Sequence, residues 1–339
     1  MSPDWQEFLT KNGARVNNQI VADFGHPDAE LIAAREGTVI APLGHLGLIE
    51  YSGNDAKAFL HSQLTSDVNH SNADAAQYSS WCSAKGRMLA SFILYQCDAD
   101  YFALLSADFQ EFIQKRLQIY VFRSQVKIDN CSAEHEFIGL SGPQAKTLLQ
   151  EAGLTIPAAS MQTSNFTNGK VIRLDEERYI IVAKQNTVAS IWQALVPKAY
   201  PVGSPAWQWL DIQRGIPWIV EATKEAFVPQ MVNFDKIGGV SFNKGCYPGQ
   251  EVVARTRYLG KVKRHLYRFH TSAPISAGAS IHSTETPEPP CGMVVSAAPA
   301  PVSGYDGLAV ILEDVINNGL KLNPSDSHDT DLTDIVAVG

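Results

Sequence analysis

The pattern of apolar residues changes twice along this chain of 339 residues, and each change limits the possible folds. From residue 38 to about residue 200, strand-like runs alternate with helix-like runs, which is typical of mixed α and β modules. Residues 216–262 hold much glycine and proline and few periodic runs. From about His265, short strands alternate with loops rich in proline, serine and alanine, so a small β-domain is expected there. The sequence therefore predicts an α+β protein.

Length and composition exclude several classes of protein. At roughly 150 residues per domain, the length corresponds to two or three domains. A hydrophobic content of 45% with 18% charged residues excludes wholesale disorder. A net charge of −8 makes the whole chain a poor non-specific binder of nucleic acid or anionic membrane. No apolar run approaches the ~20 residues of a membrane span, and Met1–Lys11 does not resemble a secretory signal. We expect a cytoplasmic protein that does not bind membranes.

The cysteines do not form a recognisable framework. Their number is odd and no CxxC pair occurs, so neither a disulfide framework nor a structural zinc site is expected. No cysteine set could hold an iron–sulfur cluster by itself, and no metal ligands are proposed. The five residues are Cys82, Cys97, Cys131, Cys246 and Cys291.

Local signals predict individual elements. The turn Ala84-Lys85-Gly86-Arg87 between apolar runs predicts a hairpin of residues 78–83 and 88–97. Ser204 and Pro205 suit the start of a helix that ends at Gly215. Residues 1–36 are expected to form a short helix and then a loop, and residues 38–51 one or two strands. Further strands are expected at 101–106, 126–128, 136–140, 171–174, 179–183, 265–270, 293–295, 308–312 and 335–338, and helices after 53–55, from about 108, after 141–143 and at 187–195.

The most distinctive local feature is the octapeptide Lys244-Gly245-Cys246-Tyr247-Pro248-Gly249-Gln250-Glu251. Two glycines and a proline specify a tight loop with unusual backbone angles. Basic neighbours stabilise a thiolate and make a cysteine reactive or a good ligand for soft metals. Cys246 is therefore a candidate functional group, although a half-buried cysteine in a structural turn is the alternative. The sequence identifies no catalytic partner; His265 and His270 are merely the nearest histidines along the chain.

Basic residues are concentrated in and after the octapeptide. Residues 244–268 carry seven Lys or Arg and one acid, Glu251, within a chain of net charge −8. Such a strip would attract a phosphate backbone, a nucleotide or the carboxylate tail of a cofactor. The alternative is an ordinary solvated basic face.

Tryptophans gather near the predicted helix exit at Gly215. Trp207, Trp209 and Trp218 could stack on a planar heterocycle, or they could pack in a core. The motifs GxGxxG, GxxxxGK[ST], HExxH and GxSxG are absent, so dinucleotide, P-loop, zinc-protease and hydrolase functions are unsupported.

Several motifs in order resemble the YgfZ family, the folate-binding, iron–sulfur-linked branch of the glycine-cleavage T-protein (aminomethyltransferase) superfamily. The octapeptide carries most of this resemblance, with Phe227-Val228-Pro229-Gln230, Asn233, Gly238-Gly239-Val240-Ser241-Phe242 and Val253-Ala254-Arg255 around it. Weaker matches are Gly53-Asn54-Asp55, Gln63-Leu64-Thr65-Ser66-Asp67-Val68, Lys85-Gly86-Arg87 and Ser141-Gly142-Pro143. Together they cover residues 38–265.

This resemblance implies three modules around a central channel. Residues 1–262 would form two interleaved α/β modules that bind folate, and residues 263–339 a C-terminal β-barrel. The implied cofactor is tetrahydrofolate or a derivative. The implied role is support of iron–sulfur cluster assembly or repair, and through client enzymes tRNA modification. The implied partners are iron–sulfur enzymes or cluster-assembly proteins, with tRNA as a further one.

The resemblance also assigns site residues. Cys246 and Lys244 take the catalytic positions, and Trp207 takes that of a tryptophan that contacts folate. A second family tryptophan falls at Leu46, which cannot stack in the same way. At the T-protein helix exit a carboxylate recognises the pterin edge; here Gln213 stands there, and its amide both donates and accepts, so pterin recognition should be altered. The remaining expected binding residues are Tyr247, Gln250, Glu251, Arg255 and Arg257.

Three functions remain as hypotheses. The first is a folate-dependent accessory protein for iron–sulfur clusters that uses Cys246. The second is a folate-dependent one-carbon transferase. It is disfavoured because Arg87–Ser91 lacks the aspartate that true aminomethyltransferases carry after the first hairpin turn. The third is a tRNA-binding protein that uses the basic strip, with salt-sensitive affinity.

Overall fold

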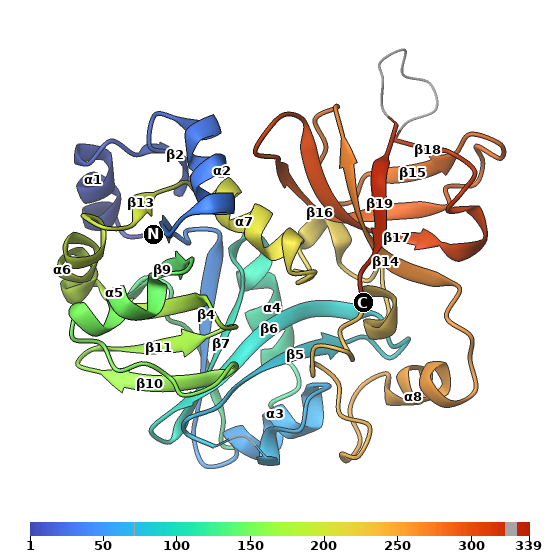
Figure 1. The fold of residues 1–339 in the computed structure, drawn as a ribbon. Helices are drawn as coiled ribbons and strands as arrows, with labels where there is room; N and C mark the ends of the chain where they lie inside the picture. Colours follow the sequence, from blue (N-terminus) through green and yellow to red (C-terminus); the bar gives the residue numbers. More distant parts are fainter. Residues whose placement is uncertain (71, 323–330) are drawn as a thin grey trace. The chain divides into compact units, whose positions relative to one another are not determined.

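The computed structural model of the protein describes residues 1–70, 72–322 and 331–339 (Figure 1). The chain divides into two compact units, each with a hydrophobic core of its own. Unit 1 comprises Met1–Phe59, Val68–Gln77 and Phe92–Trp207. Unit 2 comprises Leu60–Asp67, Tyr78–Ser91 and Gln208–Gly339.

The N-terminal segment of unit 1 is more regular than expected. Helix α1 (Pro3–Lys11) begins as a capped helix, because the Ser2 hydroxyl accepts a hydrogen bond from the Trp5 amide at 3.3 Å. Strands β1 (Arg15–Asn17) and β2 (Ile20–Asp23) then form a hairpin, and α2 (Pro27–Glu36) follows. The predicted loop after the first helix is therefore wrong. The hairpin turn uses Asn18 and Gln19 at positive φ, without the glycine that usually signals such a turn.

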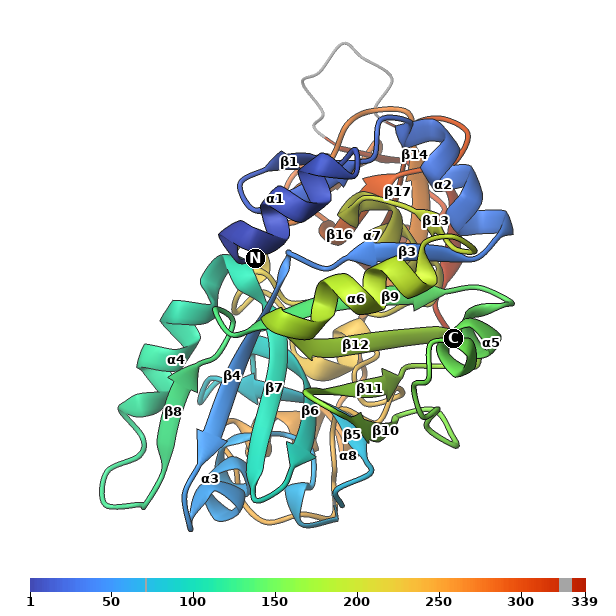
Figure 2. The ribbon, with the colours of Figure 1, turned by 90° about the vertical axis from the view of Figure 1, so that its left-hand side faces the viewer.

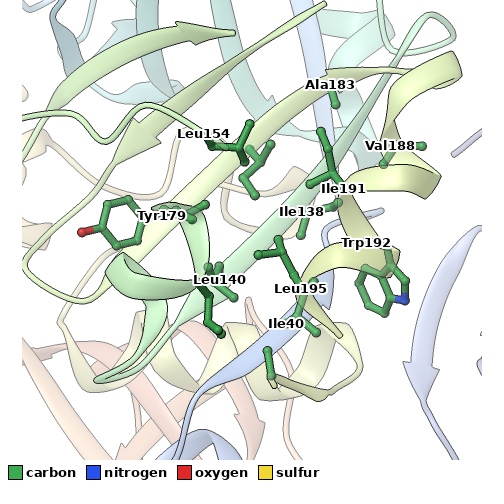
Figure 3. Packing of buried hydrophobic residues seen from close by; sticks show 14 of the residues in the cluster. Ile40, Ile138, Leu140, Leu154, Tyr179, Ala183, Val188, Ile191, Trp192 and Leu195 are labelled. Atoms are coloured by element: carbon green, nitrogen blue, oxygen red, sulfur yellow. The ribbon is translucent and has the colours of Figure 1, made fainter. Parts of the chain in front are cut away.

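Unit 1 contains a six-stranded sheet in the order β10-β11-β12-β9-β3-β13. All neighbouring strands are antiparallel except β13 and β3. Figure 2 shows α6 lying across β9 and β12. Apolar side chains of this helix, such as Ile191 and Leu195, pack with Ile138 and Leu140 of the sheet in the core (Figure 3). The elements are β3 (Val39–Pro42), β9 (His135–Ser141), β10 (Gln162–Phe166), β11 (Gly169–Arg173), β12 (Arg178–Lys184), β13 (Tyr200–Pro201), α5 (Ala145–Glu151) and α6 (Gln185–Leu195).

A five-stranded sheet has the order β5-β6-β7-β4-β8. It contains the predicted hairpin, since β5 and β6 are neighbours on either side of the turn at residues 84–87, and both strands have residues in each unit. The one or two strands expected within residues 38–51 are present as two, β3 and β4. The elements are β4 (Leu46–Ser52), β5 (Ala76–Cys82), β6 (Met88–Cys97), β7 (Asp100–Ser106), β8 (Lys127–Asn130), α3 (Ala56–Gln63) and α4 (Gln110–Gln118).

Unit 2 contains the predicted C-terminal β-structure. Its curled six-stranded sheet has the order β18-β15-β16-β17-β14-β19 (Figure 1). The predicted edge strand is present as β19, which pairs with β14. The α+β fold class is thus confirmed. Strand β14 begins directly after the predicted domain boundary at 262/263, but the boundary itself stays a prediction. The strands are β14 (Arg264–Thr271), β15 (Ser280–Ser283), β16 (Gly292–Pro299), β17 (Tyr305–Leu312), β18 (Leu320–Lys321) and β19 (Thr333–Ala337).

The segment that leads to this sheet contains the octapeptide. Helix α7 (Ser204–Gln213) begins as predicted, and Gly215 follows it at φ +66°. Helix α8 (Gln250–Tyr258) was not expected, because Val253 is its one buried residue and no apolar stripe announces it. Short 3₁₀ turns are η1 (Val68–His70), η2 (Ala107–Phe109), η3 (Glu221–Thr223), η4 (Pro229–Val232) and η5 (Glu313–Val315).

Candidate functional site

Two residues before the octapeptide form hydrogen bonds to distant backbone carbonyls of unit 2. The Gln230 side chain donates to the carbonyl of Val253 in α8 at 2.7 Å. Asn233 holds a left-handed conformation at φ 56°, and its amide donates to the carbonyl of Val338 at 2.7 Å. The 229–233 segment therefore fixes both α8 and the end of the last strand, which explains why an amide side chain stands at each position.

Lys244 is enclosed by backbone carbonyls. Its ammonium donates to the carbonyls of His61 at 2.6 Å, Leu64 at 2.5 Å and Ser66 at 2.9 Å, where α3 ends. These bonds use all three N–H donors of the ammonium. Burial lowers the pKa of Lys244 to about 8, and nearby Asp67 opposes this shift. In this geometry the side chain ties the octapeptide to residues 61–66, and a chemical role for it stays a prediction.

The octapeptide also lies directly against the hairpin turn of residues 84–87. Gly249 has φ +78°, and a Cβ there would stand 2.4 Å from the Ser83 carbonyl oxygen and 2.6 Å from Gly86 Cα. Gly86 has φ +69°, and a Cβ on it would meet Val252 Cβ at 2.8 Å. Gly249 meets backbone and Gly86 meets the Val252 side chain, and both have positive φ, so both positions favour glycine. The Lys-Gly-Arg turn and the octapeptide are therefore one structural unit.

Cys246 lies at the exposed part of this fixed loop. Tyr247 beside it is buried, and its ring centroid lies 5.1 Å from the Lys244 ammonium. Cys82, Cys131 and Cys291 are buried, and Cys97 is half-buried. Burial raises the pKa of Cys82 and of Cys131 to about 12, so neither forms a thiolate at neutral pH. Cys246 is thus the exposed thiol among the five, which agrees with the functional hypothesis and not with a half-buried structural cysteine.

A histidine that sequence reasoning missed lies beside the octapeptide. His61 Nε2 is 3.6 Å from the position that a Cβ of Gly245 would take. His61 Nδ1 lies 3.2 Å from the Asp67 carboxylate. Both side chains come from residues 61–67, so no spacing near Cys246 could have indicated them. His265 and His270, the nearest in sequence, belong instead to β14.

The basic strip does not form one face. Lys244 is buried, Arg264 donates to the Cys291 carbonyl at 2.9 Å, and Arg268 donates to the Gln213 carbonyl at 3.3 Å. Arg255 and Arg257 are exposed on α8, and Arg257 lies 3.7 Å from the Asp235 carboxylate. Gln250 is half-buried at the start of this helix and Glu251 is exposed.

Gln213 lies in a polar cluster centred on Asp306. The Gln213 amide donates to Asp306 Oδ2 at 3.0 Å, and the Trp209 indole N–H donates to the same oxygen at 2.8 Å. His270 Nδ1 lies 2.9 Å from Asp306 Oδ1. A carboxylate is therefore present beside Gln213, but it comes from β17.

The two residues aligned with folate-binding tryptophans lie in the interior of unit 1. Trp207 is 1% exposed, with the Arg178 guanidinium 5.8 Å from its ring and Gly139 against its face. Leu46 is 4% exposed in β4. Neither side chain presents an open face to a ligand in this structure, and their folate roles stay predictions. Trp218 is held by its indole N–H, which donates to Asp211 at 3.0 Å.

Two general features concern the described part of the chain. No cluster of three or more His, Cys, Asp or Glu side chains there is placed to hold a metal ion. Each helix within those residues is too short or too polar to cross a bilayer.

Comparison with known proteins first defines the class. Residues 10–183 match the family described as the GCVT N-terminal domain. The fold is similar to that of the glycine cleavage system aminomethyltransferase T from Bartonella henselae, with a TM-score of 0.79 and 16% identity over 100% of this chain and 96% of that one. The protein thus has the aminomethyltransferase fold.

Proteins of similar sequence identify the family within this fold. The protein is 33% identical over 232 residues to the tRNA-modifying protein YgfZ of Colwellia psychrerythraea, covering 68% of this chain and 71% of the relative. It is 30% identical over 246 residues to the protein of the same name from Vibrio vulnificus, covering 73% and 74%. Identity to the one from Yersinia pestis is 32% over 222 residues, covering 65% and 67%. The chain belongs to the YgfZ family, as its motifs predicted.

Proposed function

We propose that the protein is a folate-binding accessory factor that supports assembly or repair of iron–sulfur clusters through the thiol of Cys246, and that tRNA modification depends on it through client enzymes. The observation that carries this proposal is the exposure of Cys246 on a loop that is fixed on both sides. Lys244 anchors one end to the carbonyls of residues 61–66, and Gly249 anchors the other to the hairpin turn.

A fixed, exposed thiol suits transient contact with a soft metal. Thiolates are soft ligands that bind Cu(I), zinc and iron–sulfur clusters. A rigid loop presents the sulfur to a partner protein without a large cost in conformational entropy. His61 lies beside the loop and is itself paired with Asp67, and we propose that it accepts the thiol proton. The relatives' name supports the link to tRNA modification.

The cluster around Asp306 suits the polar edge of a pterin. A pterin edge carries N–H donors and needs acceptors. The Gln213 amide nitrogen is engaged by Asp306, which leaves its oxygen to accept. The Asp306 carboxylate already accepts from Trp209 and Gln213 and retains further acceptor capacity. We therefore assign pterin recognition to Gln213 and Asp306 together. When bound, a reduced folate would supply a one-carbon carrier or a reductant at this position.

Complementation tests the role of the thiol. In cells that lack this protein, the activity of an iron–sulfur enzyme is measured after expression of Cys246→Ala, Cys246→Ser or Cys97→Ala at matched levels. Cys97 is the matched control because it is the other thiol that is not fully buried. We expect both Cys246 variants to fail and Cys97→Ala to restore activity. Full rescue by Cys246→Ala would remove this thiol from the mechanism.

Folate binding is tested separately by titration of tetrahydrofolate with tryptophan fluorescence as the readout. Trp209 donates to Asp306 and should report on the pterin edge. We expect Gln213→Leu to weaken binding and Trp209→Phe to remove most of the fluorescence change. Unchanged affinity of Gln213→Leu would contradict the assignment.

A folate-dependent one-carbon transferase is the second candidate, supported by the aminomethyltransferase fold. The start of β6 argues against it, since Met88, Leu89 and Ala90 are buried and no carboxylate stands there. One-carbon transfer to tetrahydrofolate by the purified protein would decide in its favour.

Direct tRNA binding is the third candidate. It would rely on Arg255 and Arg257, which are exposed on α8, together with Lys261 and Lys263. The affinity should then fall steeply with added salt and weaken in Arg255→Gln. Weak binding that is insensitive to salt would exclude it.

A further inference from the structure

Unit 2 contains a hollow whose lining includes neither Cys246 nor Asp306. Its volume is about 350 Å³, at the lower end of the range of small-molecule pockets. It lies between the hairpin turn before β6, the segment that leads into η4, and strands β14 to β17 of the C-terminal sheet. The lining residues are Arg87, Ala226, Phe227, Met231, Arg264, Ser280, Pro290, Gly292, Met293 and Val310.

Two arginines are the charged residues of this lining. No acid is among the lining residues, and neither Arg87 nor Arg264 forms an ion pair with any carboxylate of the residues that the structure describes. Two guanidinium groups therefore line one hollow, and no negatively charged residue lines it with them. Such a pair is costly to bring together in a half-buried site unless a ligand supplies the opposite charge.

Backbone carbonyls fix both guanidinium groups in place. Arg87 Nη1 donates to the carbonyl of Ala226. Arg264 Nη1 donates to the carbonyl of Cys291 at 2.9 Å. A guanidinium has five N–H donors, so each group keeps several for a ligand. Because the groups are held in advance, a ligand does not bear the full entropic cost of ordering them.

The remaining lining is mostly apolar. Phe227, Pro290 and Val310 are apolar, and the flexible side chains of Met231 and Met293 adapt to different ligand shapes. Paired guanidinium groups beside apolar walls suit an oxyanion carried on an apolar body, because the planar forks bind carboxylate or phosphate oxygens in pairs.

We propose that Arg87 and Arg264 form a binding site for a small organic anion, a carboxylate or phosphate monoester with an apolar body. The residues that line this site include neither Cys246 nor Asp306.

Methyl NMR of methionine can test this proposal on the whole protein. The chain has five methionines, of which Met231 and Met293 line the hollow while Met1 and Met161 lie in unit 1. The protein is labelled with [methyl-¹³C]methionine and titrated with benzoate, phenyl phosphate and neutral benzamide. We expect benzoate or phenyl phosphate to shift the Met231 and Met293 signals, with little effect of benzamide. The stronger of the two anions identifies the preferred oxyanion.

Substitution of each arginine then tests whether its charge binds the anion. Arg87→Met and Arg264→Met should each weaken the anion roughly tenfold or more. Arg116→Met, on the exposed face of α4, removes the same charge elsewhere and should leave the affinity unchanged. The signal of Met88, a buried residue of unit 2, reports whether each variant is folded, and Arg264→Met stands on a different element if Arg87→Met unfolds. Three results would overturn the proposal: no shift with either anion, equal shifts with benzamide, or unchanged affinity in a folded Arg264→Met variant.

Discussion

Gly249 and Gly86 pack backbone against backbone, so that a Cβ on Gly249 would lie 2.6 Å from Gly86 Cα. These residues belong to motifs that are more than 150 positions apart in the sequence. The contact joins the hairpin turn to the octapeptide. The loop that carries Cys246 is therefore held by tertiary packing and not by its own turn residues alone.

The close approach predicts an unusual cost for alanine at Gly249. An L-residue at positive φ costs about 1–2 kcal/mol, and Gly249→Ala adds a clash with two backbone segments. Gly153→Ala is the matched control, because Gly153 has φ +74° and nothing lies within 4 Å of its added Cβ. We expect Gly249→Ala to lose roughly 3 kcal/mol or more of the free energy of unfolding and Gly153→Ala about 1–2 kcal/mol. Equal losses in chemical denaturation would contradict the contact.

Lys244→Met should destabilise the protein and change the pH dependence of its stability. Removal of the ammonium leaves three carbonyls without their donor, at a cost of about 2 kcal/mol near pH 7. Burial lowers the pKa of Lys244 to about 8. Between pH 8 and the unfolded value near 10.5, the unfolded chain holds the extra proton, so the stability of the wild type rises with pH.

The difference between wild type and Lys244→Met should therefore grow from pH 8 to pH 10 by up to about 3 kcal/mol. Lys236→Met, at an exposed position of the same segment, should show neither the loss nor the pH dependence. Urea denaturation at several pH values measures both. A constant difference across this range would mean that Lys244 keeps its ordinary titration.

Gln213→Glu should be harmful even though the resemblance to T-proteins implies a carboxylate at this position. The new carboxylate would stand about 3 Å from Asp306, where the amide now donates a hydrogen bond. We expect a loss of about 2 kcal/mol at pH 7, because one donor disappears and two like charges meet. Below about pH 4 the pair can share a proton, and the loss should shrink. Adding Asp306→Asn to Gln213→Glu should restore stability at pH 7. A fully stable single variant would show that the two side chains are not coupled.

The thiols should react in an order set by burial. Under native conditions iodoacetamide should modify Cys246 first and Cys97 more slowly, because Cys82, Cys131 and Cys291 are buried. Mass spectrometry of peptides after short exposure identifies the modified sites. If His61 accepts the thiol proton, His61→Asn should slow alkylation of Cys246 near pH 7 and leave Cys97 unchanged. Equal alkylation of Cys246 in both proteins would exclude this role of His61.

The parts of the fold that sequence could predict are those with a periodic signal or a turn signal. The hairpin around residues 84–87, helix α7 and strands β14, β16 and β17 each follow from such local patterns. Helix α8 was missed because it buries a single residue, Val253, and is stabilised by the Gln230 side chain from another segment. In the same way, His61 and Asp306 could not be inferred from sequence, because tertiary contacts alone bring them to the octapeptide and to Gln213.

The interleaving of the two units has a practical consequence. The chain passes between them after residues 59, 67, 77, 91 and 207, so no single peptide bond separates one from the other. Truncation at any one of these points would leave one unit with missing strands. A continuous fragment of the chain therefore cannot contain all of one unit without part of the other.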